Sequence, residues 1–447
     1  MKTFAKFILL LSYCLSSFSC LQAQAINQAT ILTLAERRQL LTTATQLLRE
    51  KYALPEVAVQ LEHRLRERRR TYETIENGEA LAKKLTAELY AIAHDKHLNI
   101  DYHPEGVPAD QVWQEQATSE QRASELAAMR EGMKRENFGI LDLSVLRYNI
   151  GYLNLKYLAD PEVAGESYVA ALNYLARTDA LILDLRQCGG ATSEYAIPLL
   201  CSYFFAEPTH LNDWHWREGN RTQQSWTYTQ VPGQRYLTQP IYVLIGPATF
   251  SGAEELAYDL QATKRATLIG QPTGGGANPG GTFRLSEHFA IFLPIGQAIN
   301  PLNHTNWEGV GVQPDTAVSL VRALHTAQVL ALRQLAVAPT TSPDWRGVLQ
   351  SQLRAWAQRP PQVVRQRFVL QGEPQARQVS VAGTFNGWSA TASPLVRQGN
   401  AWVGEVEVEP GQLQYKFVVD GRWLLDPANP RTEGSDDHLN SVRYADM

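Results

Sequence analysis

The residues best placed to do chemistry lie in one short stretch, 246–257, which runs from Gly-Pro through Ser-Gly to Leu-Ala. An apolar run at 240–245 precedes it and apolar residues at helical spacing follow it, so we expect a buried strand, a tight turn and a helix. Ser251 stands where the helix begins. Its hydroxyl can cap that helix, with Glu254 completing a capping box. It can instead be a nucleophile on a sharp turn, with the Gly252 amide and the positive helix end facing an oxyanion.

An acyl-transfer site needs further donors for the oxyanion, and two glycine-rich loops can offer them. These loops, 186–190 and 271–277, each follow a predicted strand. Glycine suits a loop whose backbone approaches a ligand closely. The amide of Gly189 or of Gly190 is therefore the candidate partner for the Gly252 amide.

Such a site also needs a base and a group that orients it. The loop histidines His97 and His94 are candidates for the base, and Glu308 and Asp315, which flank a glycine turn, can each orient it. Spacing alone does not separate these histidines from the others in the chain, which are His63, His103, His210, His215, His288, His304, His325 and His438.

The elements that must position these groups follow an α/β pattern. Apolar residues recur at helical spacing over 34–93, with breaks at Pro55 and Asn77-Gly78, and a connector with a helix at 119–135 comes next. Strands and helices then alternate over 148–270. That alternation predicts a mostly parallel sheet covered by helices on both faces, with the working groups beyond the carboxyl ends of its strands.

The remainder of the chain changes character at Pro360-Pro361. Helices are expected at 319–336 and 343–358, and short alternating runs after the prolines predict a small all-β sandwich. We therefore expect a signal peptide at 1–25, a helical domain at 26–102, a connector at 103–137, an α/β domain at 138–325, a helical linker at 326–361 and a β-sandwich at 362–447.

The start of the chain indicates export. Two lysines precede the apolar residues 7–11, and Ala23-Gln24-Ala25 follows at the distance of a signal-peptidase site. We expect a periplasmic or secreted protein, with lipid modification at Cys20 as the alternative. No later segment is long and apolar enough to cross a membrane.

Composition excludes several kinds of partner. The formal net charge of -4 with both signs mixed gives no electrostatic footprint for nucleic acid. Past the signal only Cys188 and Cys201 remain. They can form a disulfide in an oxidising compartment, but they lack the accompanying histidines of a zinc site. We expect no metal and no cofactor.

Four stretches in order resemble the serine peptidase family of tail-specific (C-terminal processing) proteases and tricorn-type proteases, in its branch similar to interphotoreceptor retinoid-binding protein. They are Asp95 to Leu98, Leu183 to Gly190, Gly246 to Glu255 and Glu308 to Asp315. The resemblance implies a crotonase-like core, Ser251 as nucleophile, His97 as general base and Glu308 as the distal acid. It also implies an oxyanion hole built by Gly252 with the Gly189-Gly190 loop.

The family activates its serine in two ways, and this chain resembles the histidine type. Tail-specific proteases use a lysine after a glycine-rich turn, but the turn here, 273–277, carries none. One residue departs from the tricorn pattern, because Lys96 precedes His97 where that type has a serine. Glu308 must then reach His97 directly or through water, or the site is slow or silent. Cys188 likewise replaces an asparagine that often precedes the glycine pair.

Residues 363–446 resemble the glycogen-binding module of the AMP-activated kinase beta subunit. In that family two tryptophans stack on glucose rings while a lysine and an asparagine bond the hydroxyls, and the matching positions are Trp388, Trp423, Lys416 and Asn440. Aromatic faces with a polar rim suit a sugar. The tryptophans can instead pack the sandwich, which then serves as a protein contact domain.

We therefore expect an exported serine endopeptidase that acts on peptides or unfolded protein tails, with its C-terminal module bound to an α-glucan or a protein partner. The rival interpretations are a catalytically silent carrier of an apolar ligand and a glucan-binding surface protein with a degenerate peptidase fold.

Overall fold

The computed structural model describes residues 31–446 except 109–111, 113–117, 359–361 and 436–438. These residues form two compact units, one made of the described residues up to 113 with 280–294, the other of the rest. The expected signal peptide and Cys20 lie outside the described residues. Of the helices described, none combines the length and the apolar character that a bilayer crossing requires.

The first unit joins helices to a small antiparallel sheet. Its helices are α2 (Leu34–Lys51), α3 (Pro55–Glu67), α4 (Arg69–Tyr72) and α5 (Gly78–Ala93). The helix starts follow from local chemistry, since Thr33 caps α2, proline opens α3 and Asn77 caps α5. Strand β1 (Asn99–Tyr102) pairs with β10 (Phe289–Pro294), which pairs with β9 (Gly280–Arg284). A hairpin from within the expected α/β domain thus completes the N-terminal unit.

The second unit is built on a six-stranded sheet of order β12-β8-β7-β4-β3-β2. The bounds are β2 Ile140–Leu146, β3 Ile150–Leu155, β4 Ala180–Asp184, β7 Ile241–Ile245, β8 Ala266–Gly270 and β12 Thr316–Ala317. All neighbours are parallel except the β2–β3 pair. Every residue of β4 and β7 is buried, as expected of central parallel strands covered on both faces.

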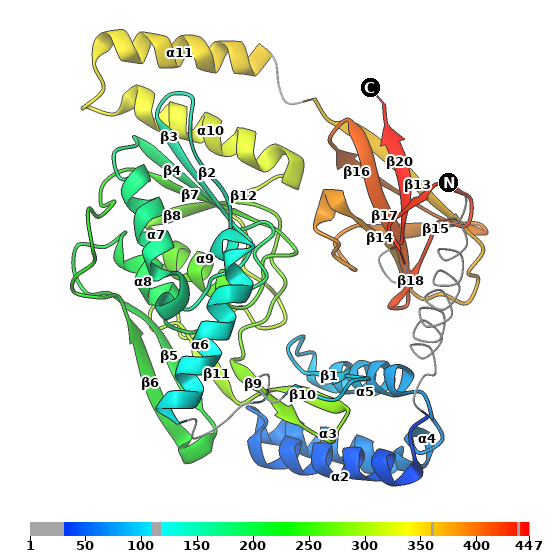
Figure 1. The fold of residues 1–447 in the computed structure, drawn as a ribbon. Coiled ribbons are helices and arrows are strands. Elements are labelled where there is room, and N and C mark those ends of the chain that lie inside the picture. The colour runs from blue at the N-terminus through cyan, green and yellow to red at the C-terminus, as the bar shows by residue number, and fades with distance from the viewer. Residues whose placement is uncertain (1–30, 109–111, 113–117, 359–361, 436–438, 447) are drawn as a thin grey trace, which may run out of the picture. The chain divides into compact units, whose positions relative to one another are not determined.

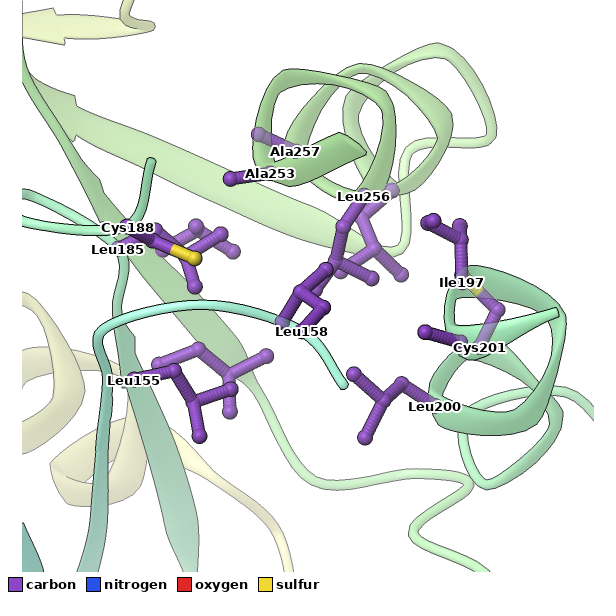
Figure 2. Close-up of a cluster of buried hydrophobic side chains, with 14 of the residues drawn as sticks. Leu155, Leu158, Leu185, Cys188, Ile197, Leu200, Cys201, Ala253, Leu256 and Ala257 are labelled. Atoms are coloured by element: carbon purple, nitrogen blue, oxygen red, sulfur yellow. The ribbon is translucent and has the colours of Figure 1, made fainter. Parts of the chain in front are cut away.

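Helices cover both faces of this sheet (Figure 1). On one face α7 (Pro161–Leu175), α8 (Ala196–Ser202) and α9 (Gly252–Ala262) form an apolar cluster with the strands, and Figure 2 shows side chains of α8 and α9 meeting there. On the other face α10 (Leu320–Val337) and α11 (Pro343–Gln358) pack against the sheet. The segment expected to be a helical linker therefore contributes to the core.

A second, antiparallel sheet of order β11-β5-β6 is bound to helix α9. Its strands are β5 (His210–Trp216), β6 (Arg221–Trp226) and β11 (Gly296–Ile299). The Asn212 side-chain amide on β5 donates to the carboxyl groups of Glu255 at 3.1 Å and Asp259 at 2.9 Å, both buried on α9. Burial raises the pKa of Asp259 to about 8. A helix α6 (Ser119–Lys134) precedes β2.

The C-terminal module is a single antiparallel β structure that encloses its own apolar core. Strand β15 pairs with both β14 and β16, so the strands fold over that core. The bounds are β13 Val364–Gln371, β14 Val379–Gly383, β15 Pro394–Gln398, β16 Ala401–Val408, β17 Gly411–Val419, β18 Arg422–Leu424, β19 Thr432–Glu433 and β20 Asn440–Ala445. The expected fold class is confirmed: N-terminal helices, a mostly parallel α/β core and an all-β module.

Candidate functional site

Ser251 lies on a strained turn between β7 and α9. Its backbone has φ 54° and ψ -127°, a region that residues with a Cβ rarely occupy. The residue is half-buried. Strain of this kind is typical of the strand-to-helix turn that presents a nucleophilic serine. The strand, sharp turn and helix predicted around Ser251 are confirmed.

Hydrogen bonds join residues 246–251, the turn of the predicted nucleophile (the nucleophile turn), to the loop after β4. The Thr249 hydroxyl donates to the Leu185 carbonyl at 2.7 Å, and the Phe250 N–H donates to the Cys188 carbonyl at 3.1 Å. Because β4 and β7 are parallel neighbours, their carboxyl ends meet at one sheet edge. A third loop joins them there, as the Gly274 N–H donates to the Thr249 carbonyl at 2.9 Å.

Glu254 fixes the nucleophile turn through a buried carboxylate. One oxygen accepts from the Ser251 N–H at 2.9 Å and the Gly276 N–H at 2.8 Å. The other accepts from the Gly275 N–H at 2.6 Å and from the Thr273 hydroxyl. The Glu254 N–H itself donates to the Ser251 carbonyl at 2.8 Å. Desolvation raises the pKa of Glu254, and these hydrogen bonds oppose the rise.

The structure distinguishes the predicted oxyanion donors. The Gly189 N–H already donates to the Lys156 carbonyl at 3.0 Å. In the described chain the amides of Gly190 and Gly252 have no such acceptor. Gly190 has φ +134°, and a Cβ there would come within 3.0 Å of the Ser251 Cβ and 3.6 Å of its Oγ. Glycine is thus required at 190, and its amide, rather than that of Gly189, is available to a bound oxyanion.

Glu308 lies at the same glycine-rich loop. Its Oε2 accepts from the Ala277 N–H at 2.6 Å and from the Asn278 N–H at 3.2 Å. The preceding Trp307 is buried and donates its indole N–H to the Gly276 carbonyl at 2.9 Å. Glu308 is therefore held by the loop that Glu254 also binds. Asp315, the other candidate acid, instead accepts from the Leu268 N–H and holds β8.

His97 lies in the first unit, on the loop between α5 and β1. The Asp95 carboxylate accepts from the His97 backbone N–H at 2.9 Å and from the Tyr52 hydroxyl at 3.2 Å. Its Oδ1 also lies 3.9 Å from the His97 Nδ1, and the ring stacks on Phe292 with centroids 5.6 Å apart. Burial lowers the pKa of His97, while the Asp95 charge acts in the opposite direction.

The positioning role of Asp95 and Tyr52 was not predicted, although Asp95 belongs to one of the four stretches that carried the resemblance. Ser251, Gly190, Gly252 and Glu308 come together in the second unit. His97 belongs to the other unit, so its pairing with Ser251 stays a prediction.

Several other candidates have structural roles. His94 is the exposed C-cap of α5, and His210 interacts with Asp213 at 3.0 Å. Cys188 and Cys201 are both buried free thiols, not a disulfide, and desolvation raises the pKa of Cys188 to about 12. Both take part in the apolar cluster beneath the nucleophile helix (Figure 2).

The four predicted sugar-binding residues share one face of the C-terminal module. Trp423 pairs with Val418 on β17, which places it on the same side as Lys416, two residues away. The Asn440 amide on β20 donates to Gln414, also on that side, at 3.1 Å. The rings of Trp388 and Trp423 are 6.5 Å apart with 43° between their planes. The inward side chains of β17 form the module's core, so Lys416 and Trp423 lie on the opposite, outer side of the sheet.

Three family models match the chain. Residues 149–318 match the model described as peptidase family S41, and residues 22–136 match the N-terminal domain of that peptidase type in eukaryotic interphotoreceptor retinoid-binding protein. Residues 366–445 match the glycogen recognition site of AMP-activated protein kinase. The resemblances found in the sequence are confirmed.

Two kinase beta subunits are similar to a short part of this chain. The chain is 34% identical over 87 residues to the human 5′-AMP-activated protein kinase subunit beta-2, which is 20% of this chain and 29% of the relative. It is 43% identical over 54 residues to the beta-1 subunit from Sus scrofa, 12% of this chain and 43% of that one. The chain thus spans less than half of these relatives.

Solved structures that are similar to this chain include a putative peptidase from Parabacteroides merdae, with 16% identity and a TM-score of 0.47 over 68% of this chain and 99% of the other. A photosystem II D1 C-terminal processing protease has 15% identity and a TM-score of 0.41, over 67% and 98% of the two chains.

Proposed function

We propose that this chain, which carries an S41-family peptidase domain, is an exported serine endopeptidase that cleaves peptides or unfolded protein tails through an acyl-enzyme. The observation that carries the proposal is the strained Ser251 turn, φ 54° and ψ -127°, with Gly190 folded against the serine side chain. A helix cap alone does not require that backbone, because cap residues ordinarily adopt extended conformations.

Each of these residues has one role in the reaction. Ser251 Oγ attacks the scissile carbonyl, and His97 accepts the hydroxyl proton and returns it to the leaving amine. The amides of Gly252 and Gly190 bond the oxyanion while the C–N bond breaks. Glu308 supports the protonated histidine. Water then attacks the acyl-enzyme and His97 takes its proton; the ester C–O bond breaks, His97 gives the proton to Ser251 Oγ, and the acid product leaves.

We further propose that the C-terminal module binds an α-glucan on the face that carries Trp388, Lys416, Trp423 and Asn440. Two aromatic rings inclined to each other can follow successive sugar units, and the lysine and asparagine supply polar contacts at the rim. Their shared position on one face of the module supports this assignment. The module then holds the peptidase at a glucan or a glucan-bearing surface.

The test of catalysis is labelling with a fluorophosphonate probe, which reacts with activated serines. We expect labelling of the mature protein and of Ser144→Ala, a control on strand β2, and no labelling of Ser251→Ala. A folded protein that does not react would contradict the peptidase proposal and leave a glucan-binding or carrier protein.

Peptide turnover tests the other roles. His97→Ala and Ser251→Ala should each remove nearly all turnover, and the double variant should be little worse, since the residues act as a unit. Additive losses would contradict a shared mechanism. Glu308→Gln keeps one acceptor oxygen for the loop amides, so we expect a slower but folded enzyme; unchanged kinetics would make Glu308 structural.

A further inference from the structure

The turn that carries Trp388 contacts the turn that carries the nucleophile. A Cβ built on Gly387 would lie 2.8 Å from the Ala248 Cβ and 3.9 Å from the Arg186 carbonyl oxygen. Gly387 immediately precedes Trp388, and Ala248 is three residues before Ser251. Because Gly387 also has φ +60°, both its backbone and its space require glycine. The sugar-binding turn and the nucleophile turn therefore meet through backbone that only glycine allows.

A second contact joins the module to the start of helix α10. Glu407 on β16 accepts from the Ser319 hydroxyl at 2.7 Å and from the Arg322 guanidinium at 2.7 and 3.2 Å. Hydrogen bonds from Arg322 and Ser319 lower the pKa of Glu407. The pair is partly exposed, with 35% and 23% of the two side chains accessible, so it orients the module more than it stabilises it.

The same helix start binds the loop that supplies the oxyanion amide. The Arg186 guanidinium donates to the Leu320 carbonyl at 2.7 Å and to both oxygens of Asp184, at 2.6 to 3.2 Å. Arg186 is four residues before Gly190. The module thus reaches the active-site loops by two routes, through Gly387 directly and through Glu407 and the first turn of α10.

We propose that the C-terminal module is a regulatory domain docked on the nucleophile turn, and that α-glucan bound at Trp388 and Trp423 raises the reactivity of Ser251. The proposal rests on the proposed function, because it couples that sugar site to that serine.

Glucan binding is linked to an equilibrium between a docked and a released module. A sugar stacked on Trp388 holds the 383–388 turn in the conformation that contacts Ala248, so it binds the docked state more tightly. In the docked state the 383–388 turn packs against Ala248. This contact favours the strained backbone that makes Ser251 reactive. By reciprocity, a reversible ligand of Ser251 that favours the docked state must tighten glucan binding by the factor by which glucan tightens the binding of that ligand.

The experiment measures the fluorophosphonate labelling rate of the full mature chain with and without saturating maltoheptaose. Its matched variants are Gly387→Ala and Gly399→Ala. The two glycines have nearly equal φ, +60° and +62°, but nothing lies within 4 Å of a Cβ at 399. Glu407→Ala and Glu405→Ala form a second pair on one strand, and Glu407 alone of these two contacts α10. Calorimetry measures maltoheptaose affinity for each variant.

We expect maltoheptaose to accelerate labelling about fivefold or more in the intact protein, in Gly399→Ala and in Glu405→Ala. Gly387→Ala and Glu407→Ala should bind the sugar yet lose most of the acceleration. A protein that binds maltoheptaose with an unchanged labelling rate would overturn the proposal, as would acceleration that survives in both docking variants. Failure of the intact protein to bind maltoheptaose would also overturn it. If Gly387→Ala does not fold, the comparison of Glu407→Ala with Glu405→Ala tests the proposal by itself.

Hydrogen exchange separates failure of this proposal from failure of the peptidase assignment. Maltoheptaose should slow amide exchange in a peptide covering 246–251, where the Thr249 and Phe250 amides are hydrogen-bonded. An unlabelled protein that shows this slowing would have a docked glucan module on a silent serine, so docking would stand while catalysis failed. If the protein is labelled but maltoheptaose does not slow amide exchange in 246–251, the peptidase assignment would stand and the docking proposal would fail.

Discussion

The turn that carries Ser251 and the turn that carries Trp388 each hold a non-glycine residue at positive φ, at 54° and 59°. In each turn a nearby buried side chain forms hydrogen bonds that hold the backbone in place. At the nucleophile turn that side chain is the Glu254 carboxylate, which accepts four hydrogen bonds. At the Trp388 turn, the proposed sugar-binding turn, it is the neutral Asn386 amide, which accepts one bond and donates two.

The Glu254 and Asn386 side chains differ in charge and in how far along the sequence their hydrogen-bond partners lie. Glu254 gathers donors from its own turn and from a loop 19 to 22 residues away, at the positive end of α9, where a carboxylate is favoured. Asn386 binds residues only three to seven positions away. The first turn depends on the tertiary structure around it, whereas the second is largely local. Substitutions that exchange amide and carboxylate test this contrast.

Glu254→Gln should have the largest effect. Both carboxylate oxygens accept from backbone N–H groups, so the new amide NH₂ must face at least one donor and leave it unpaired. A buried unpaired donor costs about 1–3 kcal/mol. We expect the fluorophosphonate labelling rate to fall about 100-fold, equivalent to about 2.7 kcal/mol. Glu56→Gln, on the exposed side of α3, is the control. Labelling within about twofold of the parent would remove Glu254 from the positioning of Ser251.

Asn386→Asp makes the reverse exchange in the module. The aspartate keeps the acceptor for the Gly383 N–H but loses the bonds donated to the Val381 carbonyl and the Ser393 hydroxyl, each 2.9 Å long. We expect the module's free energy of unfolding to fall by about 2 kcal/mol. Thermal melting of the full chain measures it, with the exposed Asn400→Asp as control. An unchanged transition would show that the turn does not need these bonds.

Replacing both tryptophans tests whether the Trp388 turn binds glucan in addition to stabilising the module. Trp388→Ala with Trp423→Ala should weaken glucan binding at least about tenfold, or about 1.4 kcal/mol, with little change in melting. Trp226→Ala is the matched control, because Trp226 and Trp423 each have 44% of their surface exposed. Retention on an α-glucan resin measures binding. If the double variant is retained like the parent, the sugar site lies elsewhere.

Features that depend on neighbouring residues could be predicted from the sequence, whereas features that depend on distant contacts could not. The turn at Ser251 was predictable because the apolar run 240–245, the glycines and the helical spacing are all local signals. The resemblance to the glycogen-binding module gave the four proposed sugar-binding residues, and alternation along a strand is consistent with Lys416 on the outer side. The sequence suggested Glu254 only as a helix cap, since nothing local indicates that its carboxylate also binds residues 273–276.

Two segments show the limit of local patterns most clearly. The hairpin 280–294 was not predicted and lies in the sequence of the expected α/β domain, yet it pairs with β1 in the N-terminal unit. Helix α10 buries Ala323, Ala327 and Ala331 against the sheet, but small residues at a spacing of four do not reveal which surface they face. For the helix only the packing partner was missed, whereas for the hairpin both the strands and their partner were missed.

His97, the proposed general base, lies in a third region, where burial and charge have opposite effects on the pKa of one residue. Only 10% of the His97 side chain is exposed, and burial lowers its pKa below the ordinary 6.5, against the attraction of Asp95. A base acts in its neutral form, so the labelling rate should rise with pH through a midpoint below 6.5. Asp95→Asn keeps an oxygen for the His97 N–H but removes the charge, which should move that midpoint lower still. The exposed Asp101→Asn on β1 should leave it in place. A midpoint above 6.5, or one that rises in Asp95→Asn, would show that a charge other than Asp95 sets the protonation of the base.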